Sequence, residues 1–170
     1  ESCPYVMFCD QNCFAKSWNL RHKFECPIMS RLITMDFTKI ELLSLRVLLQ
    51  AKCQHLSWND LFKTIELAEK VSDPKLKGFV CENDISVYDS KYYTSIHMFE
   101  TNLEKRDNSD IFHRCVASAA LLNMLIVYTS FFSDCPNMLE DILNIEENEY
   151  LWQAGGLMVH HNMTSASNMH

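Results

Sequence analysis

The chain of 170 residues is long enough to bury a core, and its 48% hydrophobic content with only three glycines excludes a disordered or fibrous protein. Its formal net charge is −7. Because binding to phosphates requires a basic surface, this charge excludes a general nucleic-acid binder, and we expect no sequence-specific contact with nucleic acid.

The first 27 residues hold half of the eight cysteines and show little apolar periodicity. A secreted disulfide scaffold would spread paired cysteines through a loop-rich chain, whereas the remainder here is rich in leucine and shows no signal peptide. We therefore expect reduced thiols. The cysteines outside this segment are expected to be small buried side chains: Cys53, Cys81, Cys115 and Cys135.

Two pairs of candidate metal ligands lie in this first segment. Cys9 and Cys13 are four residues apart, and so are His22 and Cys26, while Cys3 lies just upstream. This spacing lets two side chains converge on one ion from a single turn, and zinc accepts thiolate and imidazole ligands. A disulfide or a Cys/His catalytic pair explains fewer of these residues. The spacing therefore favours zinc.

The sequence becomes helical after this segment. Apolar residues recur at helical spacing over 37–54, and Ser57 is a suitable N-cap for a second helix over 60–70. Residues 71–90 contain a proline, a glycine and scattered polar residues, which predicts a connector.

The second half continues the helical pattern. We predict a helix over 91–105 and another that begins after a cap-like stretch at 108–110 and continues to about Thr129. A loop over 132–138, a short helix over 139–145 and a last long helix over 147–164 follow. No strand is predicted, so the fold class is mainly α. His160 and His161 lack a second ligand pair, and we expect them at the surface and edge of the last helix.

Residues 115–132 are nearly all apolar and approach the length of a membrane span. Four polar residues interrupt the run, and Arg114 precedes it directly. A helix that is apolar nearly all round is also typical of a buried central helix. The interruptions favour the buried helix, and we expect no membrane contact.

The cysteine-rich segment resembles the second half of a MYND zinc finger. The resemblance is carried by the spacing C-x5-C-x3-C ending in "FCDQNC", a following tryptophan, and "HKFEC". Phe8 matches the aromatic residue before the family's fifth cysteine, and Trp18 matches its tryptophan. Three residues separate Trp18 from His22, where the commonest family pattern has two.

The family's crosswise ligand pairing implies two zinc sites. Cys9 and Cys13 would belong to one ion, and Cys3, His22 and Cys26 to the other. The remaining ligands of the pattern would precede the first residue of this chain, so the resemblance implies a partial finger.

Downstream segments are similar to SET- and MYND-domain proteins. Residues 41–52 resemble the helix that follows the finger, residues 87–132 the helical insert, and residues 154–170 the segment that re-enters the β-rich SET core. In that last segment Asn168 matches an asparagine that helps to hold the cofactor, and Ser167 replaces a cysteine.

The implied domains are a partial MYND-type finger over 1–26, a helical SET insert over 27–154, and the start of the C-terminal SET core over 155–170. The implied activity is that of a protein-lysine N-methyltransferase, a transferase that uses S-adenosylmethionine, in the cytoplasm and nucleus. Its partners would be a lysine-bearing protein substrate and other proteins.

Later SET motifs do not occur in these residues, so we assign no catalytic residue and expect this chain alone to be inactive. The alternative is a non-enzymatic adaptor that binds proline-rich peptides.

Overall fold

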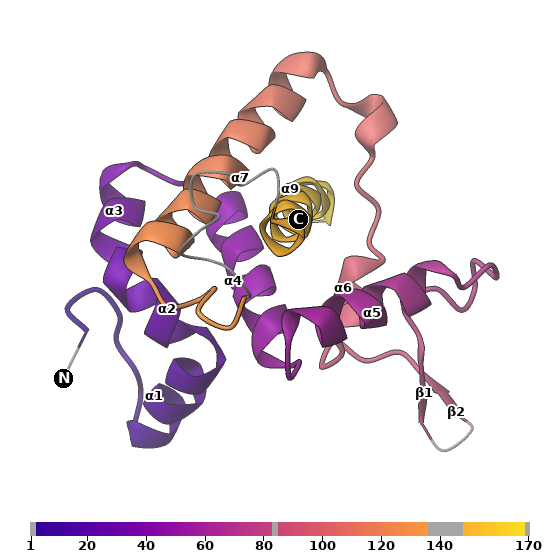
Figure 1. Ribbon diagram of the computed structural model, residues 1–170, viewed down its shortest axis with the longest axis horizontal. Helices are drawn as coiled ribbons and strands as arrows, with labels where there is room; N and C mark the ends of the chain where they lie inside the picture. The colour runs from indigo at the N-terminus through magenta and orange to yellow at the C-terminus, as the bar shows by residue number, and fades with distance from the viewer. Residues whose placement is uncertain (1–2, 83–84, 136–147, 169–170) are drawn as a thin grey trace.

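The computed structural model describes residues 3–82, 85–135 and 148–168, and it is mainly helical (Figure 1), which confirms the predicted fold class. The helices are α1 (Gln11–Ser17), α2 (Lys23–Glu25), α3 (Met29–Thr34), α4 (Lys39–Cys53), α5 (Trp58–Glu69), α6 (Tyr93–His97), α7 (Asn108–Tyr128) and α9 (Glu149–Asn168). Shorter helical turns are η1 (Trp18–His22, a π-helix), η2 (Cys26–Ile28) and η3 (Leu103–Lys105). The strands are β1 (Val80–Glu82) and β2 (Ile85–Val87).

Side-chain caps fix where the main helices begin. At the start of α4, Thr38 and Glu41 form a capping box, in which the Thr38 backbone N–H donates to the Glu41 carboxylate at 2.6 Å. Ser57 caps α5, as predicted, by accepting the N–H of Asp60. Asp107 caps α7 by accepting the N–H of Asp110. This cap lies one residue before the predicted cap-like stretch at 108–110.

Helix α9 packs against both α4 and α7, and Figure 1 views it nearly end-on beside them. The apolar side chains at this junction are completely buried, among them Leu48 of α4, Leu125 of α7 and Met158 of α9. Burying each such side chain contributes about 1.5–3 kcal/mol. Inside the interface, the Asn162 amide donates to the Ser118 hydroxyl at 2.7 Å, which fixes how α9 sits along α7.

The aromatic end of the core is built around Trp58, at the start of α5. Its ring stacks on Phe132 at 5.0 Å between centroids and meets Phe131 edge-on at 5.3 Å. Phe24 of α2 contacts Phe131 in turn, at 5.0 Å. This aromatic contact joins the cysteine-rich segment to the helical body.

Helix α7 is long and apolar enough to cross a membrane, and 33% of its most apolar window is buried inside the structure. Its buried face contains Ala117, Leu121 and Leu125, while Phe112 and Val127 are exposed. The helix expected here is confirmed, although one face is buried rather than its whole circumference. Core helices of soluble proteins pass the same length and composition test, and the absence of membrane contact stays a prediction.

Two predictions of secondary structure were wrong. The expected connector contains an antiparallel hairpin, in which Val80 pairs with Val87. The expected helix over 91–105 ends with α6 at His97, and Asn102 adopts a left-handed conformation with φ 51°. In the stretch after α6, the carbonyl of Thr101 accepts a hydrogen bond from the guanidinium of Arg106 at 2.9 Å. The short helix predicted over 139–145 lies outside the described residues.

The boundaries expected from the family resemblance fall inside helical structure. The expected start of the SET core, residue 155, lies within the continuous helix α9, which runs four residues beyond its predicted end. Among the cysteines expected to be buried, Cys135 is buried, but Cys81 and Cys115 are exposed and that prediction was wrong.

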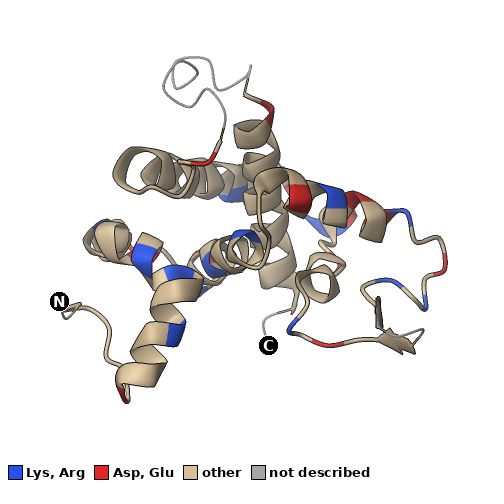
Figure 2. Ribbon diagram, turned by 60° about the horizontal axis from the view of Figure 1, so that its bottom comes forward, with Lys and Arg blue, Asp and Glu red and all other residues tan. Residues whose placement is uncertain are grey.

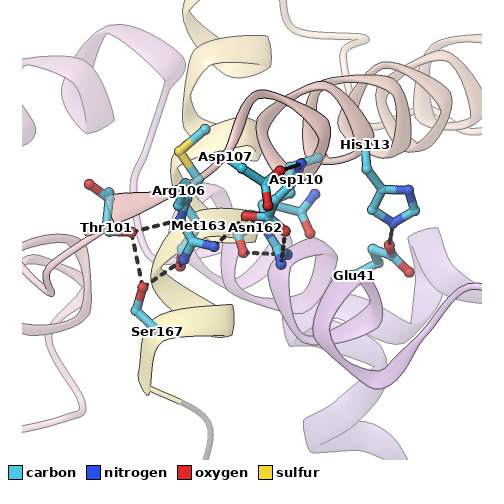
Figure 3. Close-up of polar contacts among 10 residues, drawn as sticks. Glu41, Thr101, Arg106, Asp107, Asp110, His113, Asn162, Met163 and Ser167 are labelled. Atoms are coloured by element: carbon cyan, nitrogen blue, oxygen red, sulfur yellow. Dashed lines mark hydrogen bonds and ion pairs between the residues drawn. The ribbon is translucent and has the colours of Figure 1, made fainter. Parts of the chain in front are cut away.

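The amino-terminal end of α7 is tied to the carboxyl-terminal end of α9 by an arginine cluster (Figure 3). The Arg106 guanidinium donates to the Asp110 carboxylate at 2.6 Å, and to the Met163 carbonyl and Ser167 hydroxyl at 2.7 Å each. Arg114 donates to the other Asp110 oxygen at 2.7 Å and to the Asn162 carbonyl at 3.2 Å. Positive charge at the end of α9 also complements the helix dipole.

Replacing Arg106 by methionine should lower the free energy of unfolding by about 2–3 kcal/mol, since bonds to two helices are lost and acceptors remain inside the protein. Chemical denaturation followed by circular dichroism measures this change. The neighbouring Lys105 is the matched control because its side chain is 74% exposed. Lys105→Met should change stability by less than about 0.5 kcal/mol, and equal effects of the two substitutions would contradict the assigned role of Arg106.

The same cluster makes stability depend on pH. Hydrogen bonds from Arg114 and then Arg106 lower the pKa of Asp110 in the folded protein. A lowered folded pKa stabilises the fold above the unfolded value of about 3.9, and this contribution disappears as the pH falls through the folded pKa. Asp110→Asn should therefore be less stable than the parent protein at pH 7, and the difference should shrink below about pH 4. A difference that does not vary between pH 7 and pH 3 would contradict this assignment.

Candidate metal centre

Cys3, His22 and Cys26 come together at one point of the cysteine-rich segment. Their ligand atoms all lie within 4.8 Å of one another. His22 ends the π-helical turn η1 and Cys26 begins η2, so the intervening α2 places both side chains on one face, one turn apart. Cys3 approaches from the segment that precedes α1. The predicted group of three ligands is therefore assembled in space.

His22 is the buried member of this group. Its ring is completely buried, yet within the described part of the chain neither Nδ1 nor Nε2 has a hydrogen-bond partner. Leaving a buried polar group unsatisfied costs about 1–3 kcal/mol. Two sulfurs and an imidazole nitrogen are the donors that zinc prefers, and an ion among them would satisfy one nitrogen. The residues present therefore fit a zinc ion.

The two cysteines of this group are half-buried and reduced. Desolvation raises the pKa of the Cys26 thiol, and the hydrogen bond and charge of Cys3 raise it further. Thiolate is the form that binds a metal, so ion binding at this point releases protons.

Aromatic rings surround His22. Phe8 contacts its imidazole edge-on at 5.3 Å between centroids, and Trp18 does so at 5.9 Å. Phe14 completes the cluster, packing on Phe8 at 5.3 Å and stacking on Trp18 at 5.6 Å. These rings shield the histidine from water.

A second group of candidate ligands contains Cys9, Asp10 and Cys13, whose ligand atoms also lie within 4.8 Å of one another. All three residues are exposed. The Cys9 thiol donates to the Cys13 sulfur at 2.7 Å, and this contact is the largest cause that raises the pKa of Cys13 to about 11. Asp10 also caps α1 by accepting the Cys13 N–H at 2.7 Å.

The separation into two groups matches the pairing that the zinc-finger resemblance implies. Cys9 and Cys13 lie together, apart from Cys3, His22 and Cys26. Asp10 was not predicted as a candidate ligand, because an aspartate just before a helix is typical of an N-cap.

Asn168, the residue expected to hold a cofactor, is exposed near the end of α9. Its amide donates to the Thr164 carbonyl at 2.7 Å and to the Glu100 carbonyl at 3.2 Å. The preceding Ser167, which stands where the family has cysteine, donates to the Thr101 carbonyl at 2.9 Å. Contact between Asn168 and S-adenosylmethionine stays a prediction.

A chain of polar contacts that joins α9 to α6 and α5 was not expected. His161, predicted at the helix surface or edge, is completely buried, and its Nε2 lies 2.9 Å from the Tyr93 hydroxyl. That hydroxyl lies 3.2 Å from His97 Nδ1, and His97 Nε2 lies 2.9 Å from the Glu69 carboxylate. Desolvation holds the pKa of His161 well below its usual value, so the ring stays neutral. Partners distant in sequence explain this burial.

Comparison with known protein families, with curated proteins and with solved structures finds no match to this chain.

Proposed function

We propose that residues 3–26 form a zinc-binding module whose ion fixes the cysteine-rich segment to the helical body. The observation that carries this proposal is the convergence of Cys3, His22 and Cys26 around a buried imidazole with two unpartnered nitrogens. Zinc is the favoured ion because thiolate and imidazole donors in a tetrahedral arrangement are its usual protein ligands.

The role of the ion is structural. None of the residues of α1 is buried, so apolar packing contributes little to holding this helix in position. Small modules of this kind take their folding free energy from the metal, about 10–16 kcal/mol for a complete ligand set. In the described residues three donors meet at the first site, and the fourth position would be filled by water or by a donor outside them.

For the whole protein we propose a protein-lysine N-methyltransferase of the SET and MYND type that uses S-adenosylmethionine. The support is the motif resemblance, together with the grouping of the five candidate zinc ligands. Asn168 would face the cofactor, and the residues of this chain would supply the finger and the helical insert. Methyl transfer requires the methyl group, the lysine amine and a positioned tyrosine in line, so we expect these 170 residues alone to be inactive.

The alternative is an adaptor that binds a proline-rich peptide. A groove of about 440 Å³ at the second group of candidate ligands favours it. Its lining combines the apolar Val6, Met7 and Phe8 with basic and acidic side chains, namely Lys16, Arg21, Arg46 and Glu25. In Figure 2 several lysine and arginine positions are coloured blue along the ribbon of the N-terminal helices. Such a groove suits an apolar peptide that carries acidic residues.

The isolated chain should bind one zinc ion at Cys3, His22 and Cys26 more tightly than any ion at Cys9 and Cys13, because the second group is exposed and Asp10 is engaged as a cap. Cys26→Ser should weaken the tighter site by about a hundredfold, as one of few ligands is removed. Competition with a chromophoric chelator measures the affinity, and cobalt(II) absorption reports thiolate ligation.

Cys81→Ser is the control, since Cys81 is also a free thiol but lies in the hairpin, outside the two groups of candidate ligands. Its zinc affinity should equal that of the parent protein. The proposal fails if Cys26→Ser binds zinc as tightly as the parent protein does, or if the parent protein binds none.

The purified chain should transfer no methyl group from S-adenosylmethionine to protein lysines, measured with a radiolabelled methyl group and histone or total cell protein as acceptor. Turnover that disappears on Asn168→Ala would show that the described residues already contain a complete site. The matched variant Asn123→Ala, on α7, controls for general effects of removing an amide.

A further inference from the structure

Glu25 is a buried carboxylate within the candidate metal centre. It lies on α2 between His22 and Cys26 and is 3% exposed. Carboxylates are almost never this buried without partners. Its partners are two arginines and one histidine, and the two carboxylate oxygens face different ones.

One oxygen of Glu25 is held by arginine. Oε1 accepts a hydrogen bond from Arg46 Nε at 2.6 Å and lies 4.0 Å from Arg21 Nε. Arg46 belongs to α4, so this contact reaches from the cysteine-rich segment to the helical body. Because Arg46 fixes Oε1, the direction of the second oxygen is fixed as well.

The second oxygen faces His22. Oε2 of Glu25 lies 3.5 Å from His22 Nδ1, too long for a hydrogen bond but within reach of a small ring rotation. Both nitrogens of His22 are otherwise unpartnered among the described residues. An imidazole that binds a metal through one nitrogen usually donates its other N–H to a carboxylate, which fixes the tautomer and the ring orientation.

We propose that Glu25 is the positioning residue of the zinc site: its Oε2 accepts the Nδ1–H of His22, which leaves Nε2 as the metal ligand. This inference rests on the proposed zinc site. Zinc with two thiolates and a neutral imidazole carries no net charge, and the charge of the buried Glu25 carboxylate is compensated by the arginines that face its Oε1. Zinc binding is thereby coupled through Glu25 and Arg46 to the packing of α4.

A purely structural reading makes Glu25 only the ion-pair partner of Arg46. The two readings differ in what Glu25→Ala does to the metal. For a positioning residue, zinc affinity at the site of Cys3, His22 and Cys26 should fall about 10- to 100-fold. Glu25→Gln keeps the shape and an oxygen acceptor, so its loss should be smaller. Arg46→Met should lower stability and lower zinc affinity less than Glu25→Ala does, because the carboxylate remains next to His22 but loses the contact that fixes its direction.

The experiment uses the full chain loaded with zinc alone, with affinities from chelator competition and histidine nitrogens observed by NMR after 15N labelling. In the parent protein we expect His22 with a proton on Nδ1 and the metal on Nε2. In Glu25→Ala the Nδ1 proton should exchange faster with water. Glu66→Gln is the charge control, because Glu66 forms an exposed ion pair with Lys70, and it should match the parent protein in both measurements.

The outcomes separate the two proposals. If the parent protein binds no zinc through His22, the zinc site itself is wrong. If it binds zinc with the metal on Nδ1, or if Glu25→Ala and Glu25→Gln both keep parental affinity and Nδ1–H exchange, the role of Glu25 is wrong and the zinc site stands. Should Glu25→Ala fail to fold, the isosteric Glu25→Gln decides, and its affinity must then lie below that of Glu66→Gln.

Discussion

The arrangement of the cysteine-rich segment, residues 3–26, depends on the buried imidazole of His22, against which the other parts of the segment pack. Phe8 and Trp18 pack against the ring, Cys3 and Cys26 bring their sulfurs next to it, and Glu25 faces one of its nitrogens. A histidine removed from water with neither nitrogen satisfied is unfavourable by itself. A bound ion would satisfy one of these nitrogens and, through Cys3 and Cys26, would hold the segment in place.

The two parts of the molecule are stabilised by different forces. Helices α4, α5, α7 and α9 bury leucine, methionine and aromatic side chains, and that burial is sufficient to define their packing. The cysteine-rich segment contributes few apolar residues to this core. Its attachment runs through Phe24 against Phe131 and through Glu25 with Arg46. Removing the proposed zinc ion is therefore expected to loosen residues 3–26 without unfolding α4, α5, α7 and α9.

Most helices and the metal ligands follow from local patterns in the sequence. Ser57 was predicted as a cap from its position before an apolar run, and the spacing of Cys9 from Cys13 and of His22 from Cys26 predicted which thiols meet. What sequence reasoning missed depends on distant contacts. The burial of His161 requires Tyr93, and the non-helical stretch after α6 is contacted by α9, where Ser167 donates to the Thr101 carbonyl. No local pattern carries that information.

The candidate metal centre differs from the other buried polar clusters in how many of its polar atoms lack a hydrogen-bond partner. The Arg106 cluster between α7 and α9 has partners for its guanidinium within the protein, and His161 uses one ring nitrogen on Tyr93. Among the buried side chains of the described residues, His22 alone leaves two polar atoms without a hydrogen bond. Buried polar groups are nearly always paired, and a doubly unpaired ring beside two thiols is the observation on which the proposed zinc site rests. Each of the other buried side chains with an unpartnered polar atom leaves one such atom, and none of them lies between two cysteine sulfurs in the described residues.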